Sequence, residues 1–466
     1  MTEQTEQQKK VVTRFAPSPT GFLHSGTYRT AVFSYLFAKK HGGEFILRIE
    51  DTDKERSKKE YEDNIMESLS WLNMSYDRFY RQSENAPRHK EILEKLISNG
   101  NAYISKEEAR DGSGVIKEIV RFKNPNRIVS FVDAIRGEIK MDTTDLGDFV
   151  IAKNLNEPLF HLAVVVDDAD EGVTHIIRGD DHISNTPRHI LLYEALGFEV
   201  PTYAHLPLVL SEDRTKLSKR KGAKAITEYR DQGYLPGAML NFITMIGFND
   251  GTEKEIFTMD ELIQAFDLEK VQKGGAIFNP VKLDWLNKEH IKLLSGADFK
   301  KQVLVYMSDA LQSLPTFTER IDAVLPTIKE RLTKFGDIRD MEAVGDLQYF
   351  FIDPSYDSAL LLCTEKQRKG KESMIIADLV PVYGNLKTII SQINAADGNF
   401  TPDSIKEAVW PYAEQEGRGL VLWALRTALS GKERSPDPFT LVSIFGKEEA
   451  IRRIDIALQK IHESTQ

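Results

Sequence analysis

The first hundred residues alternate between short apolar runs and segments whose apolar residues recur at helical spacing. Val11, Val12 and Phe15 form a short run that stops before Pro17 and Pro19, which is typical of a strand that ends in a loop. The same patterns predict a strand over 44–49 and helices over 28–40, 58–71 and 88–98, with a capping box from Ser57 to Glu60 at the start of the second helix.

The pattern changes between residues 101 and 156. Short alternating runs over 115–122, 128–132, 138–141 and 149–152 predict a small α+β insertion between two halves of a doubly wound sheet. Residues 160–168 are almost continuously apolar, which predicts a parallel strand covered on both faces. A further strand is expected over 175–178, followed by a helix that Thr186 caps, that Pro187 opens and that ends near Gly197.

Beyond residue 227 the chain is predicted to be almost entirely helical. Helices are expected over 235–246, 259–266, 283–294, 299–311 and 374–393, and Thr258 with Glu261 forms a capping box. No run of short alternating segments follows residue 300. The sequence therefore predicts an α/β Rossmann-like domain with an α+β insertion, followed by an all-α C-terminal half.

Composition narrows the class of protein. A net charge of −10 argues, as an average, against a nucleic-acid partner, although basic residues cluster over 214–224 and 366–371. The single cysteine, Cys363, excludes an intrachain disulfide and a cysteine-rich zinc site. The N-terminus is polar and acidic and no long apolar run follows, so we expect a cytoplasmic protein that makes no membrane contact.

The loop over 14–26 carries the first candidate chemistry. A glycine-containing turn that leads into a helix presents free backbone N–H groups and the positive end of the helix dipole, which suits a phosphate. A plain turn is the alternative, since this pattern alone is common. Ser25 and Thr27 are predicted to cap the helix with their hydroxyls.

Three stretches identify a family. Pro-Ser-Pro-Thr-Gly-Phe-Leu-His-x-Gly over 17–26, Gly-Gly-x-Phe-Ile-Leu-Arg-Ile-Glu-Asp-Thr-Asp over 42–53 and Lys-Leu-Ser-Lys-Arg over 216–220 resemble the signatures of class I glutamyl-tRNA synthetases. The resemblance covers most of the chain. It departs from the family pattern at Ser25 and Thr27, although His24 and Gly26 remain.

The resemblance implies an ATP site. His24 and Gly26 correspond to the first family motif, and Lys216 and Lys219 to the second, so these four are the candidate catalytic residues. Ser218 and Arg220 join them as candidate ATP-binding residues. Positive charges in a closing loop would neutralise the charge that develops on pyrophosphate as it leaves. Mg²⁺ is expected to arrive with the phosphates of ATP.

The resemblance also implies a glutamate pocket. Arg14 and Arg178 would bind the two carboxylates, and Glu50 and Ser18 the ammonium. A structural ion pair is the alternative for Arg14 and Glu50. Phe160 and Val164 stand where many members have tyrosine and asparagine, so the pocket wall loses a hydroxyl and an amide.

Other polar residues near this pocket are less specific. Asp180, Asp181 and His182 follow the strand that carries Arg178, and they either support the pocket residues or contact the ribose. Their spacing is not that of metal ligands, and 103–106 lacks the cysteines of the zinc knuckle that some members carry, so we expect no zinc and no metal site in the protein itself.

The family organisation maps onto the chain as five segments. They are the first half of the catalytic domain (1–100), an insertion that binds the acceptor stem (101–158), the second half (159–205), a helical connecting domain with the Lys216–Arg220 loop (206–294) and a helical anticodon-binding domain (295–466). The expected partners are L-glutamate, ATP and tRNA-Glu, with tRNA-Gln left open, and we expect a monomer.

Three rivals remain at this stage. Glutaminyl-tRNA synthetase shares the catalytic motifs but has a β-rich anticodon region, which the sequence after residue 300 does not predict. A tRNA-binding paralogue without catalysis would be expected to lack His24, Lys219, Arg14 or Glu50, and all four are present. A small-molecule adenylyltransferase would not need the helical half.

Overall fold

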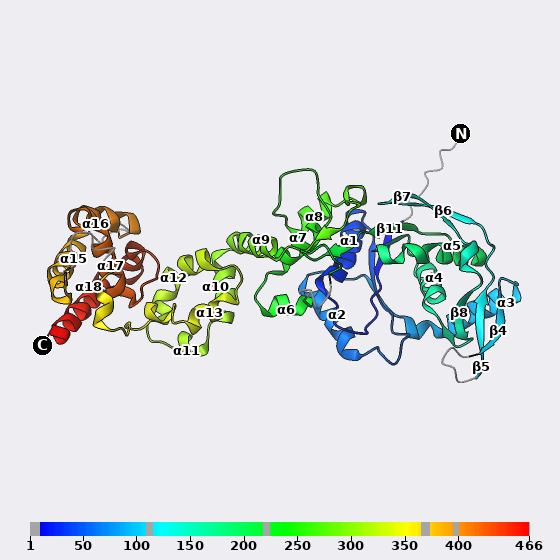
Figure 1. Ribbon diagram of the computed structural model, residues 1–466, viewed down its shortest axis with the longest axis horizontal. Helices are drawn as coiled ribbons and strands as arrows, with labels where there is room; N and C mark the ends of the chain where they lie inside the picture. The colour runs from blue at the N-terminus through cyan, green and yellow to red at the C-terminus, as the bar shows by residue number, and fades with distance from the viewer. Residues whose placement is uncertain (1–9, 109–114, 218–223, 365–372, 395–399, 466) are drawn as a thin grey trace. The chain divides into compact units, whose positions relative to one another are not determined.

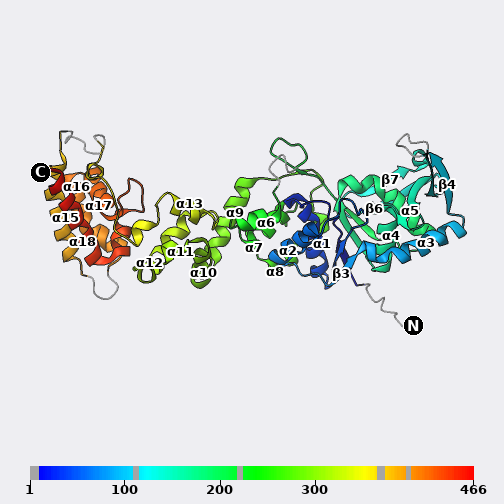
Figure 2. The ribbon, with the colours of Figure 1, turned by 90° about the horizontal axis from the view of Figure 1, so that it is seen from below.

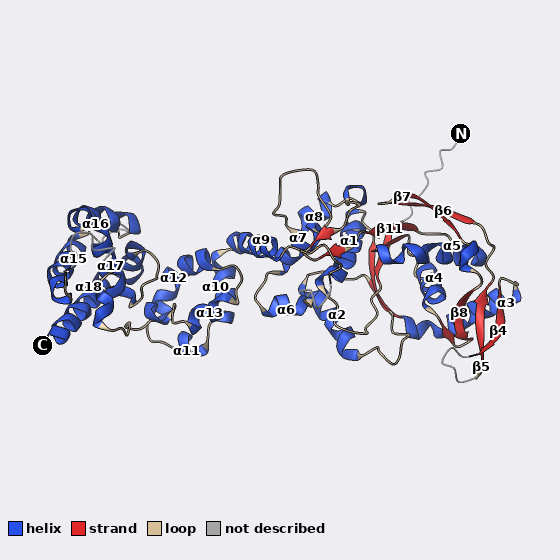
Figure 3. Ribbon diagram, viewed as in Figure 1, coloured by secondary structure: helices blue, strands red, loops and turns tan. Residues whose placement is uncertain are grey.

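The computed structural model describes residues 10–108, 115–217, 224–364, 373–394 and 400–465. The chain divides into two compact units, Met1–His290 and Ile291–Gln466. Within the described residues every strand lies in the first unit, and the second unit is helical (Figure 3). The predicted fold class, an α/β domain with an insertion followed by a helical half, is confirmed.

Five parallel strands form the centre of the first unit. β1 (Val12–Phe15) pairs with β2 (Glu44–Ile49), and β2 pairs with β3 (Arg78–Arg81). β10 (His175–Gly179) pairs with β11 (Thr202–Leu206). The amide of Thr174 donates to the carbonyl of Val12 at 2.9 Å, so β10 lies beside β1 and the strand order is β3-β2-β1-β10-β11. The order reverses between β1 and β10, where open α/β sheets bind their ligands.

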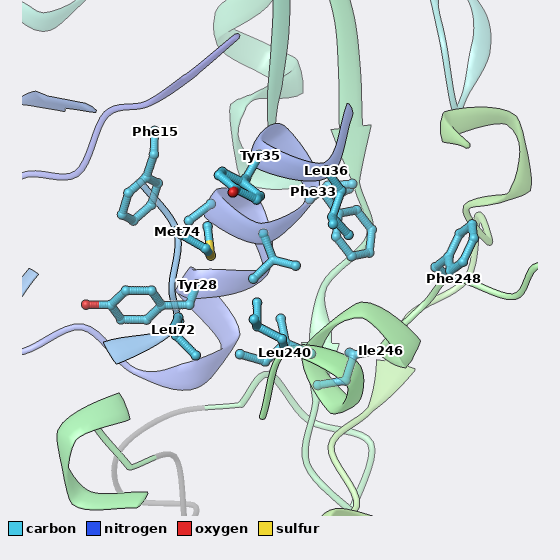
Figure 4. Close-up of a cluster of buried hydrophobic side chains, with 14 of the residues drawn as sticks. Phe15, Tyr28, Phe33, Tyr35, Leu36, Leu72, Met74, Leu240, Ile246 and Phe248 are labelled. Atoms are coloured by element: carbon cyan, nitrogen blue, oxygen red, sulfur yellow. The ribbon is translucent and has the colours of Figure 1, made fainter. Parts of the chain in front are cut away.

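Helices cover one face of this sheet with residues from distant parts of the chain. α1 (Ser25–Lys40) packs against α7 (Pro236–Met245) and α8 (Met259–Ala265), as Figure 1 shows. Tyr28 and Phe33 of α1 and Leu240 of α7 belong to the buried cluster drawn in Figure 4. The start of α1 is therefore held by the sheet on one side and by the 236–265 helices on the other.

The opposite face is covered by α3 (Ala86–Ser98), α4 (Phe160–Asp170) and α5 (Thr186–Leu196), which lie together in Figure 2. Strand residues alternate between the two cores: Phe45 belongs to the first and Ile46 to the second. The sheet is thus buried on both faces, as a doubly wound parallel sheet requires.

The residues between α3 and α4 form two antiparallel pieces. One sheet contains β4 (Ala102–Glu108), β5 (Ile116–Phe122), β8 (Phe149–Asn154) and β9 (Glu157–Pro158). The second piece is a hairpin of β6 (Ile128–Asp133) and β7 (Gly137–Asp142). Asp133 of β6 pairs with Tyr203 of β11, so this hairpin extends the central sheet rather than standing apart from it.

The strand predicted over 160–168 is wrong, because these residues form the helix α4. Every residue from Leu162 to Asp168 is buried between the sheet and the neighbouring helices. A helix buried on all sides carries the same continuous apolar run as a buried strand, so hydrophobicity alone did not distinguish them. The helical spacing brings Phe160, Val164 and Asp168 to one side of α4.

The caps predicted for three helices are also wrong. The N-cap of α1 is His24 in extended conformation, with Ser25 as the first helical residue, and α2 (Lys59–Trp71) has Lys58 as its N-cap without a side-chain bond from Ser57. The box at Thr258 is confirmed, because its hydroxyl accepts from the amide of Glu261. Thr186 is the first residue of α5. The Thr186 hydroxyl does not cap the helix and instead accepts a hydrogen bond from Arg178.

The remaining elements of the first unit are short. They are α6 (Ile226–Asp231), β12 (Val209–Leu210) and β13 (Ala276–Ile277). The boundary between the two units falls inside α9 (Pro280–Leu293). Where the structure describes the chain, no helix is both long enough and apolar enough to span a bilayer.

The second unit is built from amphipathic helices. The last helix, α18, bends at Gly446, whose φ of 75° is a left-handed conformation that glycine adopts without steric cost. The helices are α10 (Gly296–Tyr306), α11 (Asp309–Gln312), α12 (Phe317–Arg331), α13 (Asp337–Ala343), α15 (Val380–Gln392), α16 (Pro402–Glu416), α17 (Arg418–Ser430) and α18 (Pro438–Thr465).

Candidate active site

A pocket of about 680 Å³ opens at the carboxyl ends of β1, β2, β10 and β11. It gathers residues from elements that are far apart in the sequence. The predicted site residues that line it are Arg14, Ser18, His24, Gly26, Glu50, Phe160, Val164, Arg178 and Lys216. Three further candidates, Ser218, Lys219 and Arg220, lie outside the described residues.

His24 and Gly26 lie where the loop after β1 enters α1. The carbonyl of His24 accepts from the amide of Thr27 at 2.9 Å, which closes the first turn of the helix. A Cβ at Gly26 would meet Nδ1 of the His24 ring at 3.0 Å and Leu217 at 3.4 Å. The glycine therefore leaves the room that the imidazole occupies beside the helix N-terminus, a position suited to an anion.

The lysine loop is anchored to the same place at both of its described ends. The amide of Leu217 donates to the carbonyl of Val209, and Lys216 bridges to Leu210. On the far side of the loop, the carbonyl of Lys224 accepts from the amide of Ser25 at 3.1 Å. Lys216 is exposed at the pocket, with its ammonium 3.7 Å from Asp181.

Arg14 and Glu50 belong to one buried charge cluster. Asp168 of α4 accepts from Arg14 at 3.1 Å and lies 2.8 Å from Arg48. Arg48 also contacts Glu50 at 3.3 Å. Both Arg14 and Glu50 therefore have the structural ion pairs that the sequence left open, yet both also line the pocket.

The ionisation of this cluster is uneven. Burial opposes the negative charge of Asp168, but Arg14 and Arg48 lower its pKa below the usual value. Burial raises the pKa of Glu50 despite the same two arginines. Glu171, 2.7 Å from Arg48, has its pKa raised to about 7 by burial, which Arg48 opposes and Asp168 reinforces. The cluster is thus fully charged only above neutral pH.

Arg178 has different partners. Its guanidinium donates to Nε2 of His205 at 3.2 Å, to Nδ1 of His189 at 3.2 Å and to the hydroxyl of Thr186 at 2.7 Å. A fourth, longer bond reaches the carbonyl of His182. Burial lowers the pKa of each of the three histidines, so these groups are neutral near pH 7. Arg178 therefore brings a buried positive charge to the pocket without a carboxylate in direct contact among the described residues.

Phe160 and Val164 form the apolar wall. They are one helical turn apart on α4, and Asp168 follows at the next turn. Phe160 also packs against His161, His182 and His189, with ring centroids 5.5–5.7 Å apart. The wall therefore lies between the Arg14–Asp168 pair and the groups that hold Arg178.

Sequence reasoning missed several residues that shape the pocket. Arg29 of α1 is buried at its edge, where it donates to the carbonyls of Pro207 and Ile246. Arg48 and Asp168 were missed because their partners are distant in sequence. The sequence does carry a signal for both residues, because each is a charged residue within an apolar run. A charged side chain that is buried in this way needs a buried partner of opposite charge.

No group of three or more histidine, cysteine or acidic side chains in the described part of the chain could hold a metal ion. The acidic groups nearest the pocket mouth are engaged with basic partners, Asp180 with Arg136 and Asp181 with Lys216.

Comparison with known proteins defines the class first. Residues 10–111 and 104–285 match the family model described as tRNA synthetases class I (E and Q), catalytic domain. Residues 298–458 match an anticodon binding domain. Together these matches cover both units, and the chain belongs to the class I tRNA synthetases.

Full-length relatives define the family within this class. The chain is 38% identical to the glutamate–tRNA ligase of Aquifex aeolicus over 97% of this chain and 99% of that protein. It is 37% identical to glutamate–tRNA ligase 1 of Alkalilimnicola ehrlichii over 97% and 98%. The chain belongs to the glutamate–tRNA ligase family.

A solved structure agrees with this assignment. The crystal structure of a glutamate tRNA ligase from Elizabethkingia meningosepticum in complex with its amino acid superposes with a TM-score of 0.80 at 33% identity. The match covers 97% of this chain and 99% of that one. The resemblance stated from the three sequence motifs is thereby confirmed.

Proposed function

We propose that this protein activates L-glutamate with ATP to glutamyl-adenylate and transfers the glutamyl group to the 3′ end of tRNA-Glu. The observation that carries the proposal is the pocket itself, in which two buried arginines and a buried carboxylate lie near the His24 helix start and Lys216. This arrangement suits a substrate with two carboxylates and one ammonium beside a nucleotide.

The two arginines have separate tasks. Arg178, whose hydrogen-bond partners in the described part of the chain are neutral, binds one substrate carboxylate and supplies the charge that selects an anionic side chain. Arg14 is already paired with Asp168 and orients the other carboxylate, the one that attacks ATP. Glu50 and Ser18 accept from the ammonium, and Phe160 and Val164 exclude water from the aliphatic stem.

The nucleotide lies between the start of α1 and the lysine loop. His24 donates to the phosphates, and Gly26 lets the nucleotide approach the backbone. We assign Lys216, Ser218, Lys219 and Arg220 to the charge on the leaving pyrophosphate, and the phosphates themselves would fill most of the Mg²⁺ coordination sphere. The attack joins a substrate carboxylate oxygen to the α-phosphorus and breaks the bond to pyrophosphate, so the protein's contribution is alignment and charge neutralisation.

The segments of the chain divide the recognition of tRNA. We assign the acceptor stem to the insertion over 101–158, the connecting role to 206–294 and the anticodon to 295–466, in line with the anticodon domain matched over 298–458. The catalytic domain comprises 1–100 and 159–205. Whether tRNA-Gln is also charged is left open. We further propose a cytoplasmic monomer without zinc.

ATP–pyrophosphate exchange tests the proposal. Glutamate, glutamine and aspartate are supplied in turn, each with and without total tRNA. We expect glutamate to be the one amino acid of the three that supports exchange. We also expect the enzyme to form acid-stable glutamyl-tRNA. Retained tRNA binding without exchange for any amino acid would favour a catalytically impaired paralogue, and exchange with glutamine would favour a glutaminyl enzyme.

A further inference from the structure

The groups behind Arg178 form a hydrogen-bond chain that begins in the inserted hairpin. Nδ1 of His205 lies 2.6 Å from Oδ2 of Asp133, and Nε2 of the same ring lies 3.2 Å from Nε of Arg178. Asp133 is the last residue of β6, and its pairing with Tyr203 places it beside β11. A carboxylate from the 101–158 segment thus reaches the back of the glutamate pocket.

The chemistry of the donors sets the protonation of this chain. Nε of an arginine carries one hydrogen and can only donate, so Nε2 of His205 must accept. The ring proton therefore resides on Nδ1 and is donated to Asp133. Burial lowers the pKa of His205. Burial opposes the negative charge of Asp133, but hydrogen bonds from His205 and from the amides of Arg136 and Ile135 lower its pKa below the usual value. The ring is neutral and the carboxylate is charged.

Asp133 is itself fixed from four directions. Oδ1 accepts from the amides of Ile135 at 2.9 Å and Arg136 at 2.8 Å. Oδ2 accepts from the amide of His205 at 3.1 Å as well as from its ring. Asp133 and His205 are almost completely buried, so water does not compete for these bonds.

We propose that Asp133 and His205 are positioning residues that set the orientation of Arg178 for the substrate carboxylate and leave the charge of Arg178 unneutralised. A carboxylate in direct contact with Arg178 would hold it equally well but would cancel the charge that an anionic substrate needs. The neutral ring of His205 holds the guanidinium of Arg178. The negative charge that fixes this ring belongs to Asp133, which lies on the far side of the ring from Arg178. This inference rests on the proposed function, since it assigns Arg178 to glutamate.

Asp133→Asn is the most direct test. The amide nitrogen that replaces Oδ2 would donate to Nδ1 of His205, which would move the ring proton to Nε2, where it would oppose the N–H of Arg178. The same nitrogen would also face the amide of His205. We expect the KM for glutamate to rise at least about tenfold, with the KM for ATP within about twofold of wild type.

A matched control lies on the same hairpin. Glu138 of β7 is exposed, and the side-chain contacts described for it are with Lys140 and Ser130. Glu138→Gln therefore removes the same charge from the hairpin as Asp133→Asn but leaves the hydrogen bonds between Asp133, His205 and Arg178 intact. We expect this variant to keep the wild-type KM for glutamate. ATP–pyrophosphate exchange in the presence of total tRNA measures both variants.

A second pair of variants covers the case in which Asp133→Asn does not fold. His205→Gln retains one donor and one acceptor on neighbouring atoms, and His205→Leu removes both at similar volume. We expect His205→Gln to recover most of the glutamate affinity that His205→Leu loses. Selectivity for glutamate over uncharged glutamine in exchange assays should fall in His205→Leu and be restored in His205→Gln.

The outcomes separate this inference from the proposed function. No glutamate-dependent exchange by the wild type would remove the proposed function. An active wild type, with Asp133→Asn and both His205 variants unchanged in their KM for glutamate, would remove the inference alone. An equal rise in the KM for ATP would also overturn it, because a merely structural role has that signature.

Discussion

At the scale of single residues, the pocket treats its two buried arginines in opposite ways. Arg14 contacts a carboxylate whose pKa is lowered, whereas Arg178 is held by two histidines and a threonine. A buried guanidinium without a counter-ion is costly, and a bound anion removes that cost. The pocket therefore favours a ligand that places a negative charge at Arg178.

Lys219 is expected to be the main cation for the leaving pyrophosphate. Lys219→Ala should reduce the rate of adenylate formation by about 10²-fold or more, because a charge placed for the transition state contributes a few kcal/mol. Single-turnover adenylate formation measures this step. The control is Lys254→Ala, an exposed lysine paired with Glu261. Equal rates for both variants would remove Lys219 from its assigned role.

Glu171 predicts a pH dependence of stability. In the folded protein the Glu171 carboxyl keeps its proton up to about pH 7. In the unfolded chain the same carboxyl releases the proton near the ordinary pKa of 4.5. The stability conferred by this proton is therefore complete below pH 4.5 and is lost as the pH rises to 7, a change on the order of 3 kcal/mol.

Glu171→Gln should remove that dependence, because glutamine imitates the protonated acid. The apparent melting temperature of the variant should rise relative to wild type between pH 5 and pH 8. Glu91→Gln, an exposed glutamate paired with Arg88, is the control and should follow wild type at every pH. A constant difference between Glu171→Gln and wild type would contradict the raised pKa.

At the scale of elements, α4 determines the wall of the pocket. Its spacing brings Phe160, Val164 and Asp168 to the same side. Phe160→Tyr should lower the KM for glutamate about fivefold, because the hydroxyl adds one hydrogen bond to the substrate, worth about 1 kcal/mol. Steady-state exchange measures it, with Phe79→Tyr, a partly buried ring of β3 outside the pocket lining, as the control. An unchanged KM would mean that other pocket groups already satisfy the substrate.

The elements also show what sequence patterns can decide. Residues 44–49 and the Thr258 box were predicted correctly because a short apolar run between turn residues and a capping box are both local features. The helix over 160–168 was not predicted, because a helix that is buried on every side shows no helical periodicity of apolar residues. The partners of Arg48 and Asp133 depend on which strands become neighbours, and this long-range information is absent from a single local pattern.

The residues of the candidate site also fall into those that the sequence predicted and those that it did not. Motif residues such as Arg14 and Arg178 were found from the family resemblance, and the structure brings them into one pocket. The residues that hold them, Asp168 and His205, were not found. Supporting groups carry no motif of their own, since any element that comes near can provide the bond.

At the scale of the whole molecule, a protein of net charge −10 belongs to a family that acts on tRNA. Contacts with phosphates must then come from local basic surfaces, and their strength depends on salt. The KM for tRNA should rise at least about tenfold between 50 and 200 mM KCl. The KM for glutamate should change much less, because Arg14 and Arg178 are buried and poorly screened.

Aminoacylation assays at several salt concentrations measure both constants. Sucrose in place of KCl is the control for viscosity and osmotic effects. Parallel changes in the two constants would show that salt acts on the enzyme's stability rather than on its contact with nucleic acid.

The pairing of β6 with β11 has a consequence for attempts to shorten this enzyme. A minimal catalytic domain that omits residues 101–158 would leave the backbone of β11 without its neighbour. Unpaired strand edges recruit other strands, so such a truncation would favour self-association and insolubility. A designer who wishes to trim the insertion would therefore retain the hairpin over 128–142, so that β11 keeps its neighbour.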